Sequence, residues 1–99
     1  MFVHSVYFWL KPELSVAERS RFHQGVRRLL TIPSIRQGFI GSPVASDRDV
    51  VDDTYSFVLI LMFATESAHD TYQSHHIHEM FIKECGELWE GIRVYDALG

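Results

Sequence analysis

Two segments of the chain carry runs of β-branched and aromatic residues in which both alternating phases are apolar. They are residues 2–10 (FVHSVYFWL) and residues 55–64 (YSFVLILMFA). Residues of these types favour strands, and a strand with two apolar faces is covered on both of them. Two weaker strands are predicted at residues 35–44, where glycine and proline interrupt the pattern, and at residues 91–98.

The segments between these strands carry apolar residues at helical spacing. Ser15 and Glu18 form a capping-box pattern, and an apolar stripe follows up to Pro33, which predicts a helix over residues 16–30. A short helix is predicted at residues 65–72, capped by Thr65 or Ser67. A longer helical pattern runs over residues 75–89. Its inward stripe consists of His78, Phe81, Ile82, Cys85 and Trp89.

The predicted order is therefore β-α-β-β-α-β, with the second helical segment broken in two. The α+β class follows, with a four-stranded antiparallel sheet and helices on one of its faces. A length of 99 residues fits one domain, so residues 1–99 are predicted to form a single domain.

This arrangement leaves one face of the sheet without a cover. Two helical segments can shield a single face, yet the first and third strands are apolar on both. The second face would expose Tyr7, Trp9 and several aliphatic residues, a larger patch than a soluble monomer tolerates. The sequence therefore predicts a homodimer that packs sheet against sheet.

Composition narrows the function classes. Hydrophobic residues make up 46% and charged residues 22%, as in an ordinary globular chain, which argues against intrinsic disorder. The net charge of −4 and the lack of a Lys/Arg run argue against nucleic acid or an anionic membrane as partner. The longest apolar stretch, residues 57–64, is too short to span a bilayer, and no signal peptide is evident. A cytoplasmic location is expected.

Several motifs occur in a characteristic order along the chain. His4 lies in the first strand, whose apolar run ends at Lys11, and residues 30–33 (LTIP) precede a glycine-containing strand. Residues 48–52 (RDVVD) lead to the third strand, residues 72–78 read YQSHHIH, and residues 94–96 (VYD) lie in the last strand. In these motifs, over residues 2–96, the chain resembles the stress-responsive dimeric α/β-barrel family, called Dabb. The resemblance implies a ferredoxin-like protomer and a dimer whose two sheets form a barrel.

The same resemblance implies two kinds of function. Some plant members are stress-associated, stable oligomers. A plant branch contains polyketide cyclases that perform an intramolecular aldol condensation without a cofactor. Those cyclases use a tyrosine and a histidine placed like Tyr72 and His78, and a strand-one histidine placed like His4. The chain departs from them at Phe57, where they carry a histidine, at Gly25, where they carry a pocket tyrosine, and at His76, where proline is usual.

The residue chemistry is compatible with the cyclase-like role. The ordinary pKa of histidine, about 6.5, suits His78 to proton abstraction near neutral pH. Tyr72 would donate a hydrogen bond to a developing oxyanion. The alternatives are that Tyr72 and His78 tie the two helices together, or line a pocket without catalysis. The residues predicted to line the substrate pocket are His4, Phe22, Val26, Phe57, His75 and Phe81.

Metal and cofactor sites are not expected. His75 and His78 lie at i and i+3 and could chelate a divalent ion, but two imidazoles are too few for tight binding. The acidic segment at residues 47–53 lacks the spacing of a calcium loop. No nucleotide-binding glycine loop is present, and Cys85 is expected to be a small buried hydrophobe.

Two functional hypotheses follow. In the first, the protein binds a small carbonyl or polyketide-like compound, with proton-transfer or aldol-type chemistry and no cofactor. In the second, it is a non-enzymatic, stress-associated structural protein whose histidines are packing elements. Fold alone cannot choose between them.

Overall fold

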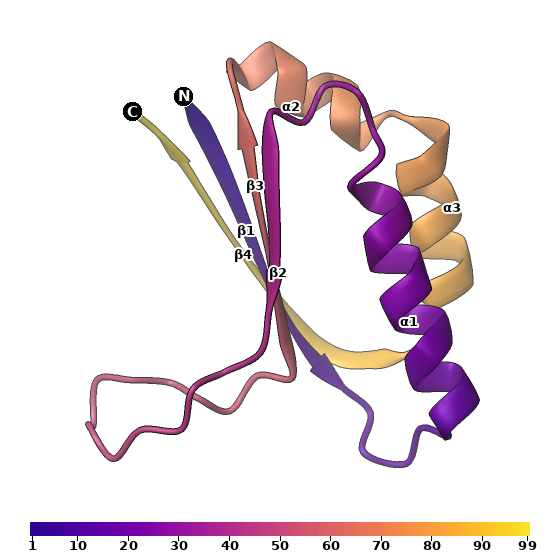
Figure 1. The fold of residues 1–99 in the computed structure, drawn as a ribbon, viewed down its shortest axis with the longest axis vertical. Helices are drawn as coiled ribbons and strands as arrows, with labels where there is room; N and C mark the ends of the chain where they lie inside the picture. The colour runs from indigo at the N-terminus through magenta and orange to yellow at the C-terminus, as the bar shows by residue number, and fades with distance from the viewer.

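The computed structural model describes residues 1–99 as one four-stranded sheet with three helices on one side (Figure 1). The strands are β1 (Phe2–Leu10), β2 (Gln37–Gly41), β3 (Phe57–Phe63) and β4 (Trp89–Leu98). The helices are α1 (Val16–Leu29), α2 (Glu66–Gln73) and α3 (His76–Cys85). The strand order is β2-β3-β1-β4 and every neighbouring pair is antiparallel. The predicted α+β class and element order are confirmed.

Local signals in the sequence explain the helix starts. The Ser15 hydroxyl accepts from the Glu18 amide at 3.1 Å, and the Glu18 carboxylate accepts from the Ser15 amide at 2.9 Å, so the predicted capping box is present. Thr65 caps α2 in the same way, accepting from the Ala68 amide at 3.1 Å. None of the three helices is long and apolar enough to cross a membrane.

The bounds of four elements, β2, β3, α3 and β4, differ from the prediction by two residues or more. β2 is shorter than residues 35–44, because Pro43 lacks the amide that a longer ladder would use. β3 begins at Phe57 instead of residue 55, and the Ser56 hydroxyl closes the ladder by accepting from the Leu10 amide at 2.9 Å. α3 ends at Cys85 and β4 begins at Trp89, because Trp89 pairs with Leu10. Trp89 therefore belongs to the sheet and not to the helical stripe.

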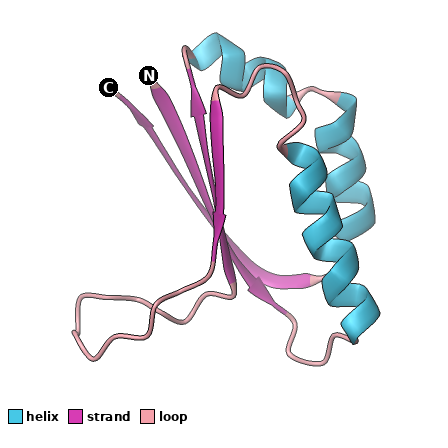
Figure 2. Cartoon of the chain, viewed as in Figure 1, coloured by secondary structure: helices cyan, strands magenta, loops and turns pink.

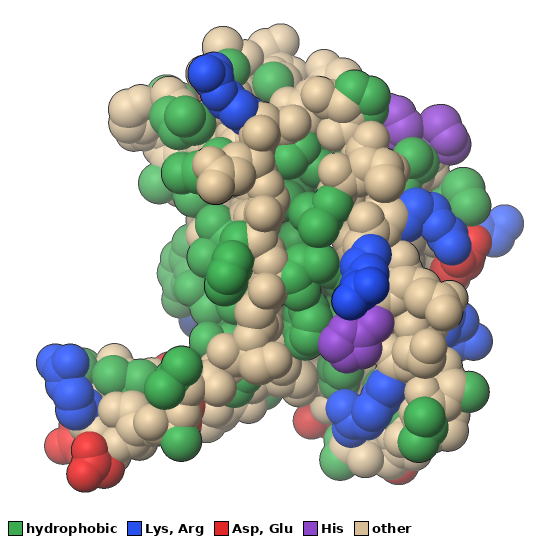
Figure 3. All heavy atoms as spheres, in the orientation of Figure 1, with side chains coloured by type: hydrophobic (Ala, Val, Ile, Leu, Met, Phe, Trp, Pro, Cys, Tyr) green, Lys and Arg blue, Asp and Glu red, His purple; other side chains and the backbone are tan.

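The two faces of β1 point to different environments. Its even-numbered residues are buried beneath the helices, whereas its odd-numbered residues are half-buried on the side without helices. We call that side the open face. It is formed by Val3, Tyr7, Trp9, Phe39, Val58, Ile60, Met62 and Tyr95. Figure 3 shows hydrophobic side chains on both sides of the sheet, so the sheet is apolar on both faces as predicted.

The loop of residues 42–56 extends from one end of the sheet toward the open-face side, away from the helices (Figure 2). It is anchored by the Trp9 indole, which donates to the Thr54 hydroxyl at 3.0 Å. Tyr55 meets Tyr7 edge to face, with ring centroids 5.0 Å apart. The loop thus continues the aromatic surface of the open face.

Helices α1 and α3 lie side by side over the core and come close together at Gly25. A Cβ atom at Gly25 would lie 2.7 Å from the Cys85 sulfur and 3.1 Å from the Phe81 ring. This position is where the cyclases resembled by the sequence carry a pocket tyrosine. A tyrosine here would require the two helices to separate, so the space on that side is closed by helix packing.

Candidate functional site

A pocket opens between the helix-facing side of the sheet and the helices, next to the edge strand β4. Its volume is about 120 Å³. It contains His4, Tyr72 and His78 together with a mainly apolar lining. The other lining residues are Val6, Phe8, Leu29, Leu59, Gln73, Phe81, Ile82, Ile92 and Val94. A few polar groups in an apolar cavity are typical of a small-molecule site.

Tyr72 contacts the rings of His4, His69 and His78, which we call the histidine cluster, and is only 2% exposed. Its ring meets that of His78 edge to face at 4.9 Å between centroids, and that of His4 at 5.9 Å. Burial raises the pKa of the Tyr72 hydroxyl well above its ordinary value of 10. The hydroxyl therefore stays protonated near neutral pH and can act as a hydrogen-bond donor.

His78 is half-buried, on the first turns of α3. Desolvation, followed by the nearby His4 and His69, lowers its pKa from the ordinary 6.5, while Glu79 opposes this shift. The ring is therefore neutral near pH 7, the form in which an imidazole nitrogen can accept a proton.

His4 is buried on β1 and pairs with Asp96 on the adjacent strand β4. The His4 Nδ1 to Asp96 Oδ1 distance is 2.5 Å, and the strand register places the two residues directly opposite each other. In the tautomer that suits this pair, His4 Nδ1–H is the donor and the Asp96 carboxylate is the acceptor. In the neutral ring, Nε2 of His4 then carries a free lone pair.

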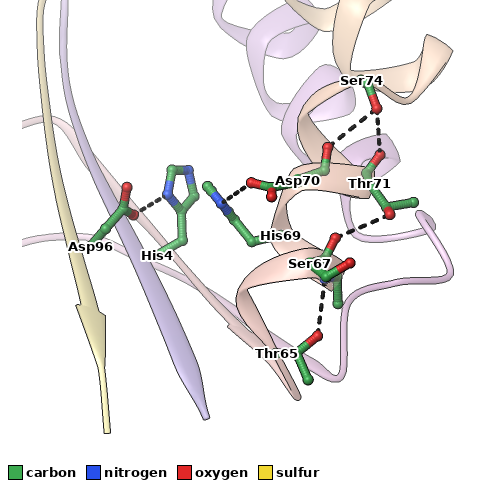
Figure 4. A network of polar contacts seen from close by, with 9 residues as sticks. His4, Thr65, Ser67, His69, Asp70, Thr71, Ser74 and Asp96 are labelled. Carbon is green, nitrogen blue, oxygen red and sulfur yellow. Dashed lines mark hydrogen bonds and ion pairs between the residues drawn. The ribbon is translucent and has the colours of Figure 1, made fainter.

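Figure 4 shows the His69 ring of α2 beside the His4 ring, with Asp96 on the other side of His4. The centroids of His4 and His69 are 4.6 Å apart, and His69 also stacks on Phe2 at 4.4 Å. Burial, followed by the nearby His4, lowers the pKa of His69 from its ordinary 6.5. Its Nε2 has no hydrogen-bond partner.

The other residues assigned to the pocket from the sequence lie elsewhere. Phe22 and Val26 of α1 and Phe57 of β3 belong to the hydrophobic core and do not line this pocket. His75 is the N-cap of α3: its Nδ1 accepts from the Ile77 amide at 3.1 Å, and its ring stacks on that of His76. With Nδ1 committed to the cap, only Nε2 of His75 is left as a possible ligand atom.

Sequence reasoning missed His69 and Asp96. His69 precedes Tyr72 by three residues, so helical spacing alone puts both on one face of α2. Asp96 stands out only once the β1–β4 register is known, because no local pattern pairs residues 92 positions apart.

Comparisons with known proteins identify the family and the fold. The model of the Stress responsive A/B Barrel Domain, Dabb, matches residues 2–98. The chain belongs to the Dabb family. No curated protein matches it in sequence.

Solved structures similar to this Dabb chain include a Dabb protein with a ferredoxin-like fold from Mesorhizobium loti. That protein is 22% identical, with a TM-score of 0.80 over 99% of this chain and 95% of the other. A hydroxynitrile lyase from Passiflora edulis is 18% identical, with a TM-score of 0.82 over 97% and 90%. A dimeric ferredoxin-like protein of unknown function from Thermobifida fusca is 14% identical, with a TM-score of 0.78 over 99% and 90%. These likenesses establish the ferredoxin-like fold.

The lowered pKa of His78 leads to an expected pH dependence of stability for this Dabb protein. Below pH 6.5 the unfolded chain binds a proton at His78 before the folded chain does. The contribution of His78 to the free energy of unfolding should therefore be fully present above pH 6.5. It should be lost as the pH falls through the lower pKa of the folded state. Urea unfolding at a series of pH values should show a smaller fall for His78→Gln than for the wild type. Equal falls in the two proteins would contradict the assignment of this pH dependence to His78. The control is His76→Ala, which removes an exposed ring.

Proposed function

We propose that residues 1–99 form a single domain that assembles as a homodimer through the open face. The support is the apolar character of that face, which includes the exposed rings of Phe39 and Tyr95. A surface of this kind is costly to leave in water. Structures with the same fold from Thermobifida fusca and from Bacteroides fragilis are described as dimeric. The cytoplasmic location expected from the sequence stays a prediction.

We further propose that each protomer binds a small carbonyl compound and carries out proton transfer or aldol-type chemistry without a cofactor. The observation that carries this proposal is the convergence of His4, Tyr72 and His78 on one apolar pocket. A structurally similar protein is a hydroxynitrile lyase. Its presence among the relatives supports lyase-type chemistry on this fold.

In this proposal His78 removes a proton α to the carbonyl, because its ring is neutral and borders the pocket. Tyr72, held in its protonated form by burial, donates a hydrogen bond to the oxygen on which negative charge develops. His4 contacts the ligand through Nε2, and Asp96 fixes the orientation of its ring. A neutral base and a neutral donor at the edge of an apolar pocket can carry out this step without a metal.

The volume of the pocket limits the substrate. A closed apolar cavity of about 150 Å³ holds one benzene molecule, and this pocket offers about 120 Å³. The enclosed part of a ligand is therefore about the size of a short aliphatic chain or one ring. A longer ligand would leave the pocket past Ile82 and Ile92, which are about half exposed.

Hydrogen exchange of small ketones tests this proposal directly. Acetone or butanone in D₂O should lose α-protons faster with the protein than in buffer, as followed by proton NMR. His78→Ala should slow the protein-dependent exchange by about 10²–10⁴-fold, the usual contribution of a positioned base. Tyr72→Phe should slow it by about 10²–10³-fold, the usual contribution of one oxyanion donor.

The matched control is His76→Ala, which removes an exposed histidine outside the pocket. It should exchange at the wild-type rate. If His78→Ala and Tyr72→Phe lose only thermal stability and exchange normally, the catalytic proposal fails. The packing role that the sequence left open for these residues would then hold.

A further inference from the structure

His4, His69 and Asp96 form a group of possible metal ligands at the inner end of the histidine cluster. Each offers one ligand atom, and the three atoms all lie within 4.8 Å of one another. They come from β1, α2 and β4, three elements that the fold brings together from distant parts of the chain. Figure 4 shows these side chains gathered between the sheet and α2.

The His69 ring gives a second, independent sign of a missing partner. It is 5% exposed, and its Nε2 is buried without a hydrogen-bond partner. Its other nitrogen, Nδ1, lies 3.8 Å from the Asp70 carboxylate, beyond hydrogen-bonding distance. A buried polar atom left unsatisfied costs about 1–3 kcal/mol, so native structures rarely retain one without a partner.

We propose that His4, His69 and Asp96 bind a divalent first-row transition cation, with zinc as the reference ion. Two imidazoles and one carboxylate are a donor set that zinc accepts, whereas magnesium and calcium prefer oxygen ligands. Three protein donors leave a coordination position open to water or to another ligand.

Small movements would complete the coordination geometry. Zinc bonds of about 2.0–2.2 Å at tetrahedral angles place ligand atoms about 3.3 Å apart. His4 Nδ1 and Asp96 Oδ1, 2.5 Å apart, would separate slightly as the ion displaces the proton between them, and the His69 ligand atom already lies within 4.8 Å of the other ligand atoms. Asp96 lies on an edge strand and has an accessible side chain, so this adjustment does not require the core to rearrange.

The bound cation would join α2 to β1 and β4. The contacts of α2 with the sheet include the stacking of His69 on Phe2 and the packing of Tyr72 against Phe63. A cation that binds the folded chain and not the unfolded one raises its apparent stability by mass action. The inference shares His4 and Asp96 with the proposed carbonyl chemistry but does not rest on it, because the ligand set is argued from the closeness of the three side chains and from the unpartnered His69 nitrogen.

Titration with zinc and with cobalt tests the site on the full chain. Untagged protein should bind one zinc ion per protomer in calorimetry, and cobalt should give visible absorption bands of a tetrahedral nitrogen–oxygen site. Magnesium should produce no binding heat. Zinc should also raise the melting temperature in a concentration-dependent way.

Two variants and one control locate the site. His69→Phe keeps a ring to stack on Phe2 but removes both nitrogens, and Asp96→Asn keeps the size of an accessible side chain. Each should weaken zinc binding by more than about 100-fold, since even groups that only support metal ligands contribute about 10–100-fold. His76→Ala removes the ring that stacks on His75 at the start of α3 and should bind zinc as the wild type does.

Zinc binding that survives in both His69→Phe and Asp96→Asn but is lost in His76→Ala would overturn the inference in favour of a surface histidine pair. No binding by the wild type would also overturn it. His69→Phe retains His4, Tyr72, His78 and Asp96, so ketone exchange by this variant, measured on metal-free samples, separates a failure of the metal site from a failure of the proposed function.

Discussion

Replacing Ile60 by aspartate is expected to convert the protein from a dimer into a monomer. Ile60 lies in β3 at the middle of the open face, paired with Ser5 on one side and Phe39 on the other. In a two-fold symmetric dimer each copy would bury one unpaired carboxylate in the shared interface. Burying such a charge costs several kcal/mol, so the dissociation constant should rise by at least about a thousandfold. Sedimentation equilibrium over a range of concentrations measures this change.

The control for this experiment is Met80→Asp, which places the same charge on the exposed side of α3. It should leave the sedimentation behaviour unchanged. A wild-type protein that sediments as a monomer at micromolar concentration would contradict the dimer itself. An Ile60→Asp protein that remains fully dimeric would show that the copies meet on another surface.

Phe22→Ala is expected to destabilise the fold severely, by about 3–5 kcal/mol, as removal of a buried aromatic ring does. Phe22 is completely buried. Its ring packs against Phe8 at 5.1 Å between centroids and against Phe57 at 5.7 Å, and it lies 6.1 Å from Phe81. The neighbouring rings are held by three different elements, so we expect them to close the resulting cavity only in part. Urea denaturation measures the loss.

The control is Val16→Ala on the same helix, where the side chain is almost fully exposed. It should change the free energy of unfolding by less than about 0.5 kcal/mol. A small effect of Phe22→Ala, combined with a loss of ligand-induced stabilisation, would mean that Phe22 faces a ligand and not the core. That result would restore the pocket role that the sequence assigned to it.

The fold could be predicted because its determinants are local. Alternating apolar residues in β1 and β3, the capping box at Ser15 and the helical stripe of α1 each act within a few residues. The errors occur where a tertiary contact decides. Trp89 extends the spacing of the α3 stripe, but its pairing with Leu10 draws it into β4. Ile82 also follows the stripe and is nevertheless about half exposed, because α3 lies near the open edge of the helix layer.

The residues of the candidate site could be predicted only in part from the sequence. The structure brings His4, Tyr72, His78 and Phe81 to one pocket. Apolar spacing identifies residues that point inward, but it does not distinguish the packed centre of the core from a cavity near its edge. Phe22 and Val26 fill the centre, whereas the pocket lies beside β4, which the helices cover incompletely. The pairing of Asp96 with His4 depends on the register between β1 and β4, which a single sequence does not reveal.

Strand β1 contributes to both surfaces of the molecule at once. His4, Val6 and Phe8 border the pocket, while Val3, Tyr7 and Trp9 lie on the open face. Because side chains alternate with a period of two, a slip of β1 by one residue against β3 and β4 would exchange the two sets. The imidazole would then enter the subunit contact, and Tyr7 would enter the pocket. Individual side chains of β1 can therefore change in evolution, but a change of its register by one residue would disrupt the pocket and the dimer interface together.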